Sequence, residues 1–162
     1  MSFLRRILPP RRRMSHRVYW LTSDLAVSKE PGIDDWAGIS AAGIRCIVDL
    51  QAEKDDNAAL VQSHGLQYMR LPIREGSTPT ELEMARVTDW ILERIAADGP
   101  VLVHCREGRG RSPLVACAAL VKLGIPPSEA YKIVRRAKAD VLLSDQQVAM
   151  LERWAITQEQ RP

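Results

Sequence analysis

The stretch from Val101 to Val121 constrains the fold more than any other part of this chain. An apolar run of strand length ends at His104 and Cys105. A short loop with two glycines and two arginines follows, and Arg111 then opens a continuous apolar segment. Strand, glycine-containing loop and helix in this order bring the loop N–H groups and the helix N-terminus to one point, where partial positive charge favours an anion. The sequence therefore predicts an oxyanion-binding loop between a buried strand and a helix.

Two side chains make this loop more than a phosphate-binding site. Cys105 stands at its entrance, where the field of the loop and helix favours the nucleophilic thiolate. Arg111 stands at its exit, and its planar guanidinium can bind two oxygens of one phosphoryl group. A cysteine that faces a bound phosphoryl group predicts covalent phosphoryl transfer through a thiophosphate intermediate.

Other loops of this general kind fit the residues less well. A dinucleotide-binding fingerprint needs a third glycine where Pro113 stands, and a Walker loop needs a Gly-Lys-Ser/Thr sequence that the segment lacks. A sulfurtransferase of the rhodanese type also carries a cysteine on a loop after a strand, but its loop is one residue shorter. The remaining alternative is a buried cysteine with incidental arginines. The Cys-to-Arg spacing favours phosphoryl transfer over it.

The residues His104-Cys105, Gly108 and Arg111-Ser112 resemble the Cys-x5-Arg-Ser/Thr signature of the protein tyrosine and dual-specificity phosphatase superfamily. The resemblance implies a compact phosphatase that hydrolyses phosphomonoesters of tyrosine, serine and threonine in proteins, through a cysteinyl-phosphate and without a cofactor. It also implies that the loop N–H groups and Arg111 hold the phosphate. Ser112 would donate a hydrogen bond to Cys105, and His104 would orient the loop.

A second loop offers the acid that this chemistry needs, because the leaving oxygen of a phosphate ester must receive a proton. The segment Pro72-Ile73-Arg74-Glu75-Gly76 resembles the Pro-Ile-x-Asp-Gly loop of the same superfamily, with Glu75 at the position of the aspartate. Glutamate is one methylene longer, which changes the placement of the acid but not its chemistry. We expect Glu75 to be the general acid. The alternative is an exposed loop glutamate beside Arg74.

The substrate class stays open between proteins and lipids. Arg106 and Arg109 lie inside the loop, a pattern similar to tensin-type phosphoinositide phosphatases and the mitochondrial phosphatidylglycerophosphate phosphatase. Glu107 between them weakens that match, and both arginines could instead pair with neighbouring acids. A phosphoprotein is the first expectation, an anionic phospholipid the second, and a phosphate-binding module without turnover the third. The expected site residues are catalytic Cys105, Arg111, Glu75 and Ser112, and substrate-binding His104, Arg106, Glu107, Gly108, Arg109 and Gly110.

Composition sets the compartment and excludes some partners. Three cysteines (Cys46, Cys105 and Cys117) are too few for a disulfide framework, so we expect a reducing, cytoplasmic compartment. The other two cysteines lie in apolar segments and are expected in the core. The three histidines form no ligand spacing, and no metal site is predicted.

Basic charge is concentrated at the N-terminus. Residues 1–17 hold six arginines and no acid, so the rest of the chain is net acidic. A contact of residues 3–17 with anionic lipid, or an organelle address, is one interpretation. A disordered leader, or translation from Met14, is the interpretation we favour. We expect a phosphatase domain over residues 18–158 that is monomeric and has no nucleic-acid partner.

Hydrophobic patterning predicts an α/β fold, a central mostly parallel sheet of about four to five strands flanked by helices. Ile33 and Trp36 are expected on the buried face of the first helix. Gln147 is expected to cap the last helix. Strands are predicted over 18–21, 25–27, 44–50, 67–71 and 101–103, and helices over 33–42, 55–64, 82–97 and 114–121, with two further helices before the C-terminus.

Overall fold

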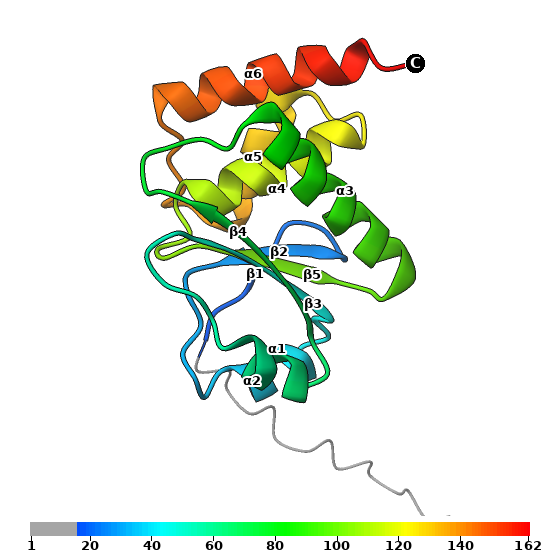
Figure 1. The fold of residues 1–162 in the computed structure, drawn as a ribbon. Coiled ribbons are helices and arrows are strands. Elements are labelled where there is room, and N and C mark those ends of the chain that lie inside the picture. The colour runs from blue at the N-terminus through cyan, green and yellow to red at the C-terminus, as the bar shows by residue number, and fades with distance from the viewer. Residues whose placement is uncertain (1–15) are drawn as a thin grey trace, which may run out of the picture.

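The structure, a computed structural model, describes residues 16–162. A five-stranded sheet forms its centre, with strands β1 (Tyr19–Trp20), β2 (Leu25–Ser28), β3 (Cys46–Gln51), β4 (Gln67–Ile73) and β5 (Val101–His104). The strand order is β1-β2-β5-β3-β4 (Figure 1). Strands β2, β5, β3 and β4 are parallel, and β1 pairs antiparallel with β2 at one edge. The predicted α/β fold with a mostly parallel sheet is confirmed.

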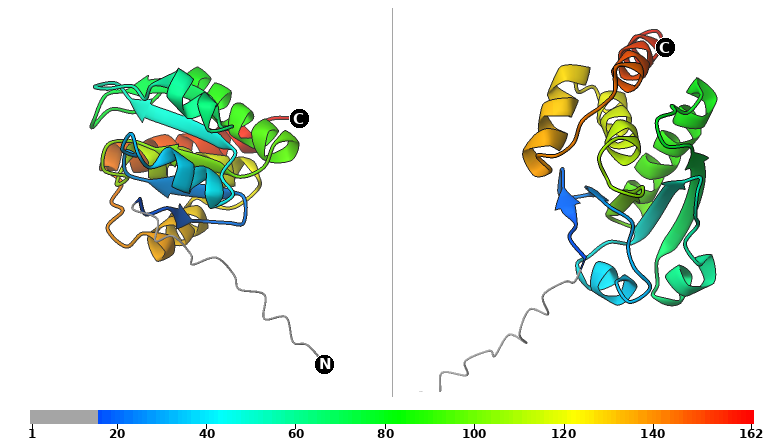
Figure 2. Two further views of the ribbon diagram at one scale, coloured as in Figure 1. Left: turned by 90° about the horizontal axis from the view of Figure 1, so that it is seen from below. Right: turned by 90° about the vertical axis from the view of Figure 1, so that its left-hand side faces the viewer.

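Helices cover both faces of this sheet (Figures 1 and 2). Two short helices, α1 (Trp36–Ala41) and α2 (Ala58–Ser63), pack on one face around a core of residues that includes Ile39, Ile47 and Leu102. The larger core lies on the other face and includes residues of four helices. These are α3 (Glu81–Ala97), α4 (Arg111–Lys122), α5 (Pro127–Ala137) and α6 (Asp145–Glu159).

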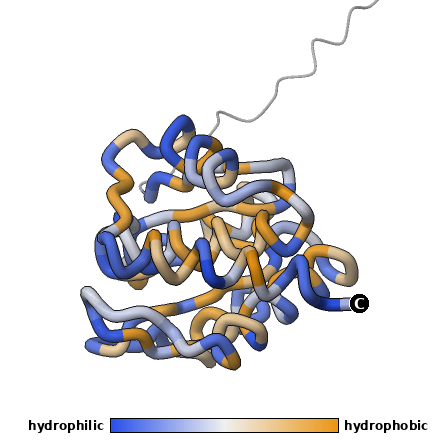
Figure 3. The backbone as a smooth tube through the Cα atoms, turned by 90° about the horizontal axis from the view of Figure 1, so that it is seen from above, coloured by the Kyte–Doolittle hydropathy of each residue, from blue (hydrophilic) through white to orange (hydrophobic). Residues whose placement is uncertain are grey.

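Helix α4 is the central helix of the larger layer. Every residue from Arg111 to Val121 is buried, as expected for a helix whose residues are apolar on all sides. Trp154 of α6 packs on it and donates from Nε1 to the carbonyl of Ala118 at 3.0 Å. The hydropathy colouring shows hydrophobic segments along the inner strands and helices, with hydrophilic residues in the outer loops (Figure 3). The loop between β5 and α4 is therefore joined at both ends to buried elements.

The two cysteines outside the loop lie in the core, as predicted. Cys46 and Cys117 are fully buried. Burial raises the pKa of Cys46 to about 11 and that of Cys117 to about 12, so both stay protonated at neutral pH. Neither thiol is activated by its surroundings.

Two helix starts were predicted wrongly. The helix expected from residue 33 begins only at Trp36, and Ile33 is 73% exposed rather than buried. The side chain of Asp35 accepts a hydrogen bond from the Gly32 N–H at 2.7 Å, and this local turn delays the helix. The helix expected from residue 55 begins at Ala58, because Asn57 caps it with a side-chain bond to the Leu60 N–H.

The predicted N-terminal leader covers residues 1–17, and residues 1–15 of it lie outside the described part of the chain. His16 is buried, and the Arg17 guanidinium lies 5.0 Å from the centre of the Tyr19 ring. Within residues 16–162, none of the helices combines the length and the hydropathy that a bilayer crossing requires.

Candidate active site

The loop between β5 and α4 lies at the carboxyl edge of the parallel strands, where sites of open α/β sheets form. Gly108 sits in the middle of this loop with a φ of +69°. A Cβ there would lie 2.7 Å from the carbonyl oxygen of Ser28 at the end of β2. The Glu30 N–H also donates to the carbonyl of Arg106 at 3.0 Å. Close packing against the segment after β2 therefore requires glycine at position 108.

Cys105 lies at the floor of the loop and is 3% exposed. Its Sγ accepts a hydrogen bond from the Gly108 N–H at 3.3 Å. The Ser112 Oγ, in the first turn of α4, lies at the same distance of 3.3 Å from the sulfur. Both contacts stabilise a negatively charged sulfur when the Ser112 hydroxyl donates.

Arg111 opens α4 and its side chain is almost fully buried, with 4% exposure. Its Nη1 donates to the Ile73 carbonyl at 2.8 Å. Nη1 and Nη2 both donate to the carboxylate of Glu53, at 2.8 and 2.7 Å. These paired hydrogen bonds with Arg111 hold the pKa of Glu53 at about 2. The bonds to Glu53 and to the Ile73 carbonyl thus fix the orientation of the guanidinium before phosphate binds.

Glu53 is a site residue that sequence reasoning missed. It follows β3, and the carboxyl end of β3 lies beside that of β5 in the sheet. The available signal was an acid just beyond the end of a buried parallel strand. Three acids, Glu53, Asp55 and Asp56, occur between β3 and α2, so this signal did not select Glu53.

A pocket of about 580 Å³ opens above Cys105. Glu75 lies on its wall, together with the adjacent Gly76, and is exposed. The hydrogen bonds that Arg111 donates to Glu53, and then the charges of Cys105, Glu53 and Glu75, raise the pKa of Arg111 above its ordinary value. The lining residues are Glu75, Gly76, Cys105, Glu107, Arg109, Gly110, Arg111, Leu142, Leu143, Ser144, Asp145 and Gln147.

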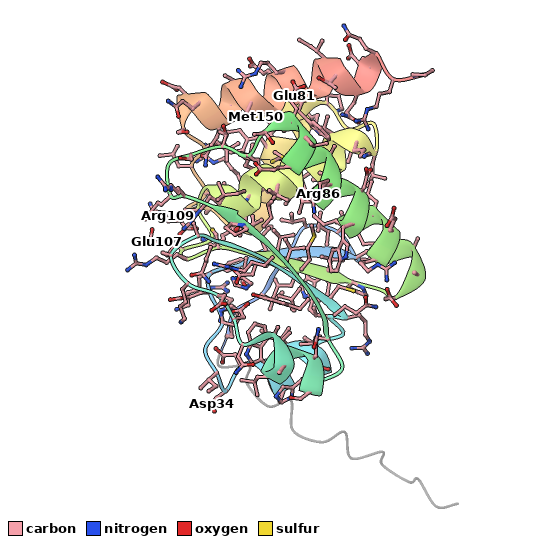
Figure 4. All side chains as sticks on the ribbon, viewed as in Figure 1. Asp34, Glu81, Arg86, Glu107, Arg109 and Met150 are labelled. Atoms are coloured by element: carbon pink, nitrogen blue, oxygen red, sulfur yellow. The ribbon has the colours of Figure 1, made fainter. Side chains whose placement is uncertain are left out.

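The two arginines inside the loop, Arg106 and Arg109, differ in whether they line the pocket. Arg109 lines the pocket, but its Nη1 lies 3.7 Å from Glu107 Oε2 and its Nε lies 3.8 Å from Asp140 Oδ2. Figure 4 shows Glu107 and Arg109 projecting outward from the same edge of the molecule. Arg106 is exposed and does not belong to the pocket lining found among residues 16–162. The positive charge of Arg109 is therefore shared with two acids.

Gly110, Gln147 and His104 are the remaining residues that the sequence singled out near the loop. Gly110 precedes α4, and a Cβ on it would lie 3.0 Å from the Gln147 Nε2. Gln147 forms the predicted cap: its N–H and side chain exchange hydrogen bonds with Ser144 at the start of α6. His104 is fully buried beneath the loop and does not line the pocket.

One buried group of potential metal ligands exists among the described residues, at Asp49, Asp56 and His104. Their ligand atoms lie within 4.8 Å of one another. His104 Nε2 lies 2.7 Å from Asp56 Oδ2, and Tyr68 donates to Asp49 at 2.8 Å. These atoms are thus already used in hydrogen bonds, and the geometry fits a polar network better than an ion site.

Comparison with known proteins places this geometry in a family. The family model described as "Polymorphic toxin system, DSP-PTPase phosphatase" matches residues 24–125. A putative tyrosine phosphatase 067L of Invertebrate iridescent virus 3 is 32% identical over 103 residues, which cover 60% of this chain and 42% of that protein. The chain spans about half the length of the curated relatives it matches.

Solved structures show the same fold. Tk-PTP in its active form superimposes with a TM-score of 0.80 at 24% identity, over 86% of this chain and 96% of that one. PTPMT1 in complex with PI(5)P superimposes with a TM-score of 0.80 at 16% identity, over 88% of this chain and 96% of that one. With the family match and the Cys105–Arg111 loop, the chain belongs to the protein tyrosine phosphatase superfamily, in its dual-specificity-like branch.

Proposed function

We propose that this protein is a cysteine-dependent phosphatase that hydrolyses phosphotyrosine, phosphoserine and phosphothreonine in proteins. One observation carries the proposal: the Cys105 sulfur lies at the floor of an open pocket, 3.3 Å from both the Gly108 nitrogen and the Ser112 oxygen. The guanidinium of Arg111 lines the same pocket, held in one orientation by Glu53. A nucleophile and an anion-binding group thus face the same space.

The first half of the reaction transfers the phosphoryl group to the enzyme. Loop N–H groups and Arg111 bind the phosphate oxygens, and the Cys105 thiolate attacks the phosphorus. The S–P bond forms as the P–O ester bond breaks. Glu75, on the pocket wall, donates its proton to the leaving oxygen.

The second half releases phosphate. The Glu75 carboxylate takes a proton from water, whose oxygen attacks the phosphorus of the cysteinyl-phosphate. The S–P bond breaks and the thiolate leaves, stabilised by hydrogen bonds from Ser112 and the Gly108 N–H. Glu75 returns to its acidic form for the next cycle.

The charge at the pocket mouth favours a protein substrate over a polyanionic lipid. Arg109 is the exposed cation among the described lining residues, and its charge is met by Glu107 and Asp140. Glu75 and Asp145 add two carboxylates to the lining, and the exposed Leu142 adds an apolar surface. Additional phosphate groups around the pocket would meet like charges. The aromatic ring of a phosphotyrosine would instead find an apolar contact.

A phospholipid is the second candidate substrate. PTPMT1, which has the same fold, was crystallised with PI(5)P. The arginines at 106 and 109 give this candidate its own support, since release of Arg109 from its partners would create a cationic rim. A phosphate-binding module without turnover is the third candidate and requires that Glu75 be non-productive.

The test is phosphate release from a panel of phosphotyrosine and phosphothreonine peptides, phosphoinositides and phosphatidylglycerophosphate. Cys105→Ser serves as the blank, because it keeps the fold but removes the nucleophile. Preferential release from the peptides supports the protein phosphatase. Preferential release from the lipids makes Arg106 and Arg109 specificity residues, and no Cys105-dependent release from any substrate leaves only the binding module.

A further inference from the structure

Three carbonyl groups of the loop between β5 and α4 accept hydrogen bonds from donors outside the loop. The carbonyls of Arg106 and Arg109 each accept from a backbone N–H group at 3.0 Å. The carbonyl of Glu107, which lies between them in the chain, accepts from the Nζ of Lys138 at 3.4 Å. Lys138 is thus the one side chain among these three donors, and a substitution can remove its contact alone.

The contact with Lys138 determines where one N–H group of the loop points. The carbonyl of Glu107 and the N–H of Gly108 belong to the same planar trans peptide group, so they point in opposite directions. Lys138 lies on the carbonyl side of this group. On the other side, the Gly108 N–H donates to the Cys105 sulfur at 3.3 Å. The N–H group therefore faces the nucleophile while the carbonyl faces away from it.

This peptide group depends on an external contact because its own residues do not restrain it. Gly108 has a φ of +69°, and glycine adopts positive and negative φ about equally well. The side chain of Glu107 is exposed, and its carboxylate lies 3.7 Å from Arg109. If the peptide group rotated, the Glu107 carbonyl oxygen would face the thiolate and the phosphate, and like charges would repel.

Lys138 is held firmly enough to restrain the loop. It follows α5 directly and is 4% exposed. Its Nζ lies 2.6 Å from Asp140 Oδ1 and 5.4 Å from the centre of the Tyr19 ring, so the buried ammonium group has both a carboxylate and an aromatic partner. Its backbone N–H donates to the Val134 carbonyl at 2.9 Å. Both ends of the lysine side chain are therefore fixed.

We propose that Lys138 is a positioning residue for phosphoryl transfer, which aims the Gly108 N–H at the phosphate by holding the Glu107 carbonyl. An N–H group that is already oriented stabilises the charge of the transition state without a reorientation cost. Lys138 does not belong to the pocket lining found among residues 16–162, so it acts through the loop. The inference rests on the proposed function, since it assigns a residue to the same site.

The test compares two lysine-to-methionine variants. Lys138→Met keeps the apolar part of the side chain but removes the donor and the charge. Lys132→Met makes the same change on α5, where the lysine is exposed and pairs with Glu129 at 2.9 Å. The second variant is the matched control, because its side chain does not reach the loop.

The first measurement is the hydrolysis of an aryl phosphate and its inhibition by vanadate, which adopts the five-coordinate geometry of phosphoryl transfer. We expect Lys138→Met to lower kcat/KM and to weaken vanadate inhibition by about tenfold each, because one N–H of the loop is no longer held in place. The loss should appear more in kcat than in KM. Lys132→Met should match the wild type. Unchanged vanadate inhibition in folded Lys138→Met overturns the proposal.

The second measurement is the nuclear magnetic resonance signal of the loop amides in ¹⁵N-labelled protein, with and without vanadate. In the wild type, the signals of Gly108 and Gly110 should both shift on binding. In Lys138→Met, the Gly108 shift should shrink while the Gly110 shift remains, because the Arg109 carbonyl of the Gly110 peptide group keeps its own donor. Equal losses at both glycines would show a general loosening of the loop and would overturn the proposal.

These measurements separate the inference from the proposed function. Vanadate binding requires no turnover, so a wild-type protein that binds vanadate but releases no phosphate refutes the proposed function while the Gly108 signal stays measurable. An active protein whose Gly108 signal is the same with and without Lys138 refutes the inference alone. If Lys138→Met does not fold, Lys138→Gln replaces it with the same expected results, since its side chain is one bond shorter and does not reach the Glu107 carbonyl.

Discussion

Replacing Glu53 by glutamine tests the ion pair that orients Arg111. The change keeps the shape of the side chain and one acceptor oxygen but removes the charge that faces the guanidinium. The structure gives this pair two short hydrogen bonds, at 2.7 and 2.8 Å, with an Arg111 side chain that is 4% exposed. We expect Glu53→Gln to destabilise the protein at neutral pH, because it leaves a buried guanidinium with a weaker partner.

The magnitude follows from the pKa of Glu53, which the bonds to Arg111 lower from 4.5 to about 2. At 1.36 kcal/mol per unit, this shift corresponds to an upper bound of about 3 kcal/mol. The Glu53 side chain is 34% exposed, so solvent screening reduces the expected contribution to about 1–2 kcal/mol. Because the folded-state pKa is the lower one, this stabilisation is complete above the unfolded pKa of 4.5. It is lost as the pH falls toward 2.

The assay is urea unfolding of both proteins at several pH values between 7 and 3. Glu53→Gln should unfold with a free energy about 1–2 kcal/mol lower at pH 7, and the difference should shrink as the pH falls below about 4.5. Glu152→Gln, at an exposed position of α6, is the control and should change the stability little. A Glu53→Gln difference that is absent at pH 7, or that grows on acidification, would refute the reasoning.

Three further outcomes are expected. Glu75→Gln should abolish turnover of substrates with basic leaving groups while aryl phosphates with good leaving groups still react; equal losses in steady-state rates would place the acid elsewhere. Gly108→Ala should abolish activity and lower the melting temperature, because its Cβ would lie 2.7 Å from the Ser28 carbonyl, whereas Gly76→Ala at φ +79° meets no atom within 4 Å and should cost only about 1 kcal/mol. Ser112→Ala should slow breakdown of the cysteinyl-phosphate, so that stopped-flow kinetics show a burst of released alcohol before a slower steady state. A variant that shows no burst and turns over at the wild-type steady-state rate would contradict this role.

Local patterns predicted most of the fold. The continuous apolar run of β5 and the apolar residues all around α4 are buried as expected, because complete burial leaves a signal at every position. The cap at Ser144 was also readable, since a capping box needs only residues three positions apart. The starts of α1 and α2 were not, because Asp35 and Asn57 set them through individual hydrogen bonds.

The loop between β5 and α4 was predicted as an anion-binding site from the spacing of its residues and from their resemblance to the Cys-x5-Arg signature. Cys105, Gly108 and Arg111 belong to one short segment, and the backbone of that segment determines their mutual placement. Glu75 was placed by a short loop motif, and the structure brings it to the same pocket wall. In both cases the informative residues lie next to one another in the chain.

Tertiary structure decided what surrounds that loop. Glu53 and Asp56 lie about 50 residues before the groups that they bind, in one loop that also holds Asp55. Only the parallel pairing of β3 with β5 brings that loop under Arg111 and His104. A helix or a strand leaves a periodic pattern of apolar residues in the sequence. Which of several neighbouring carboxylates binds a given side chain depends instead on distances of a few ångströms through space.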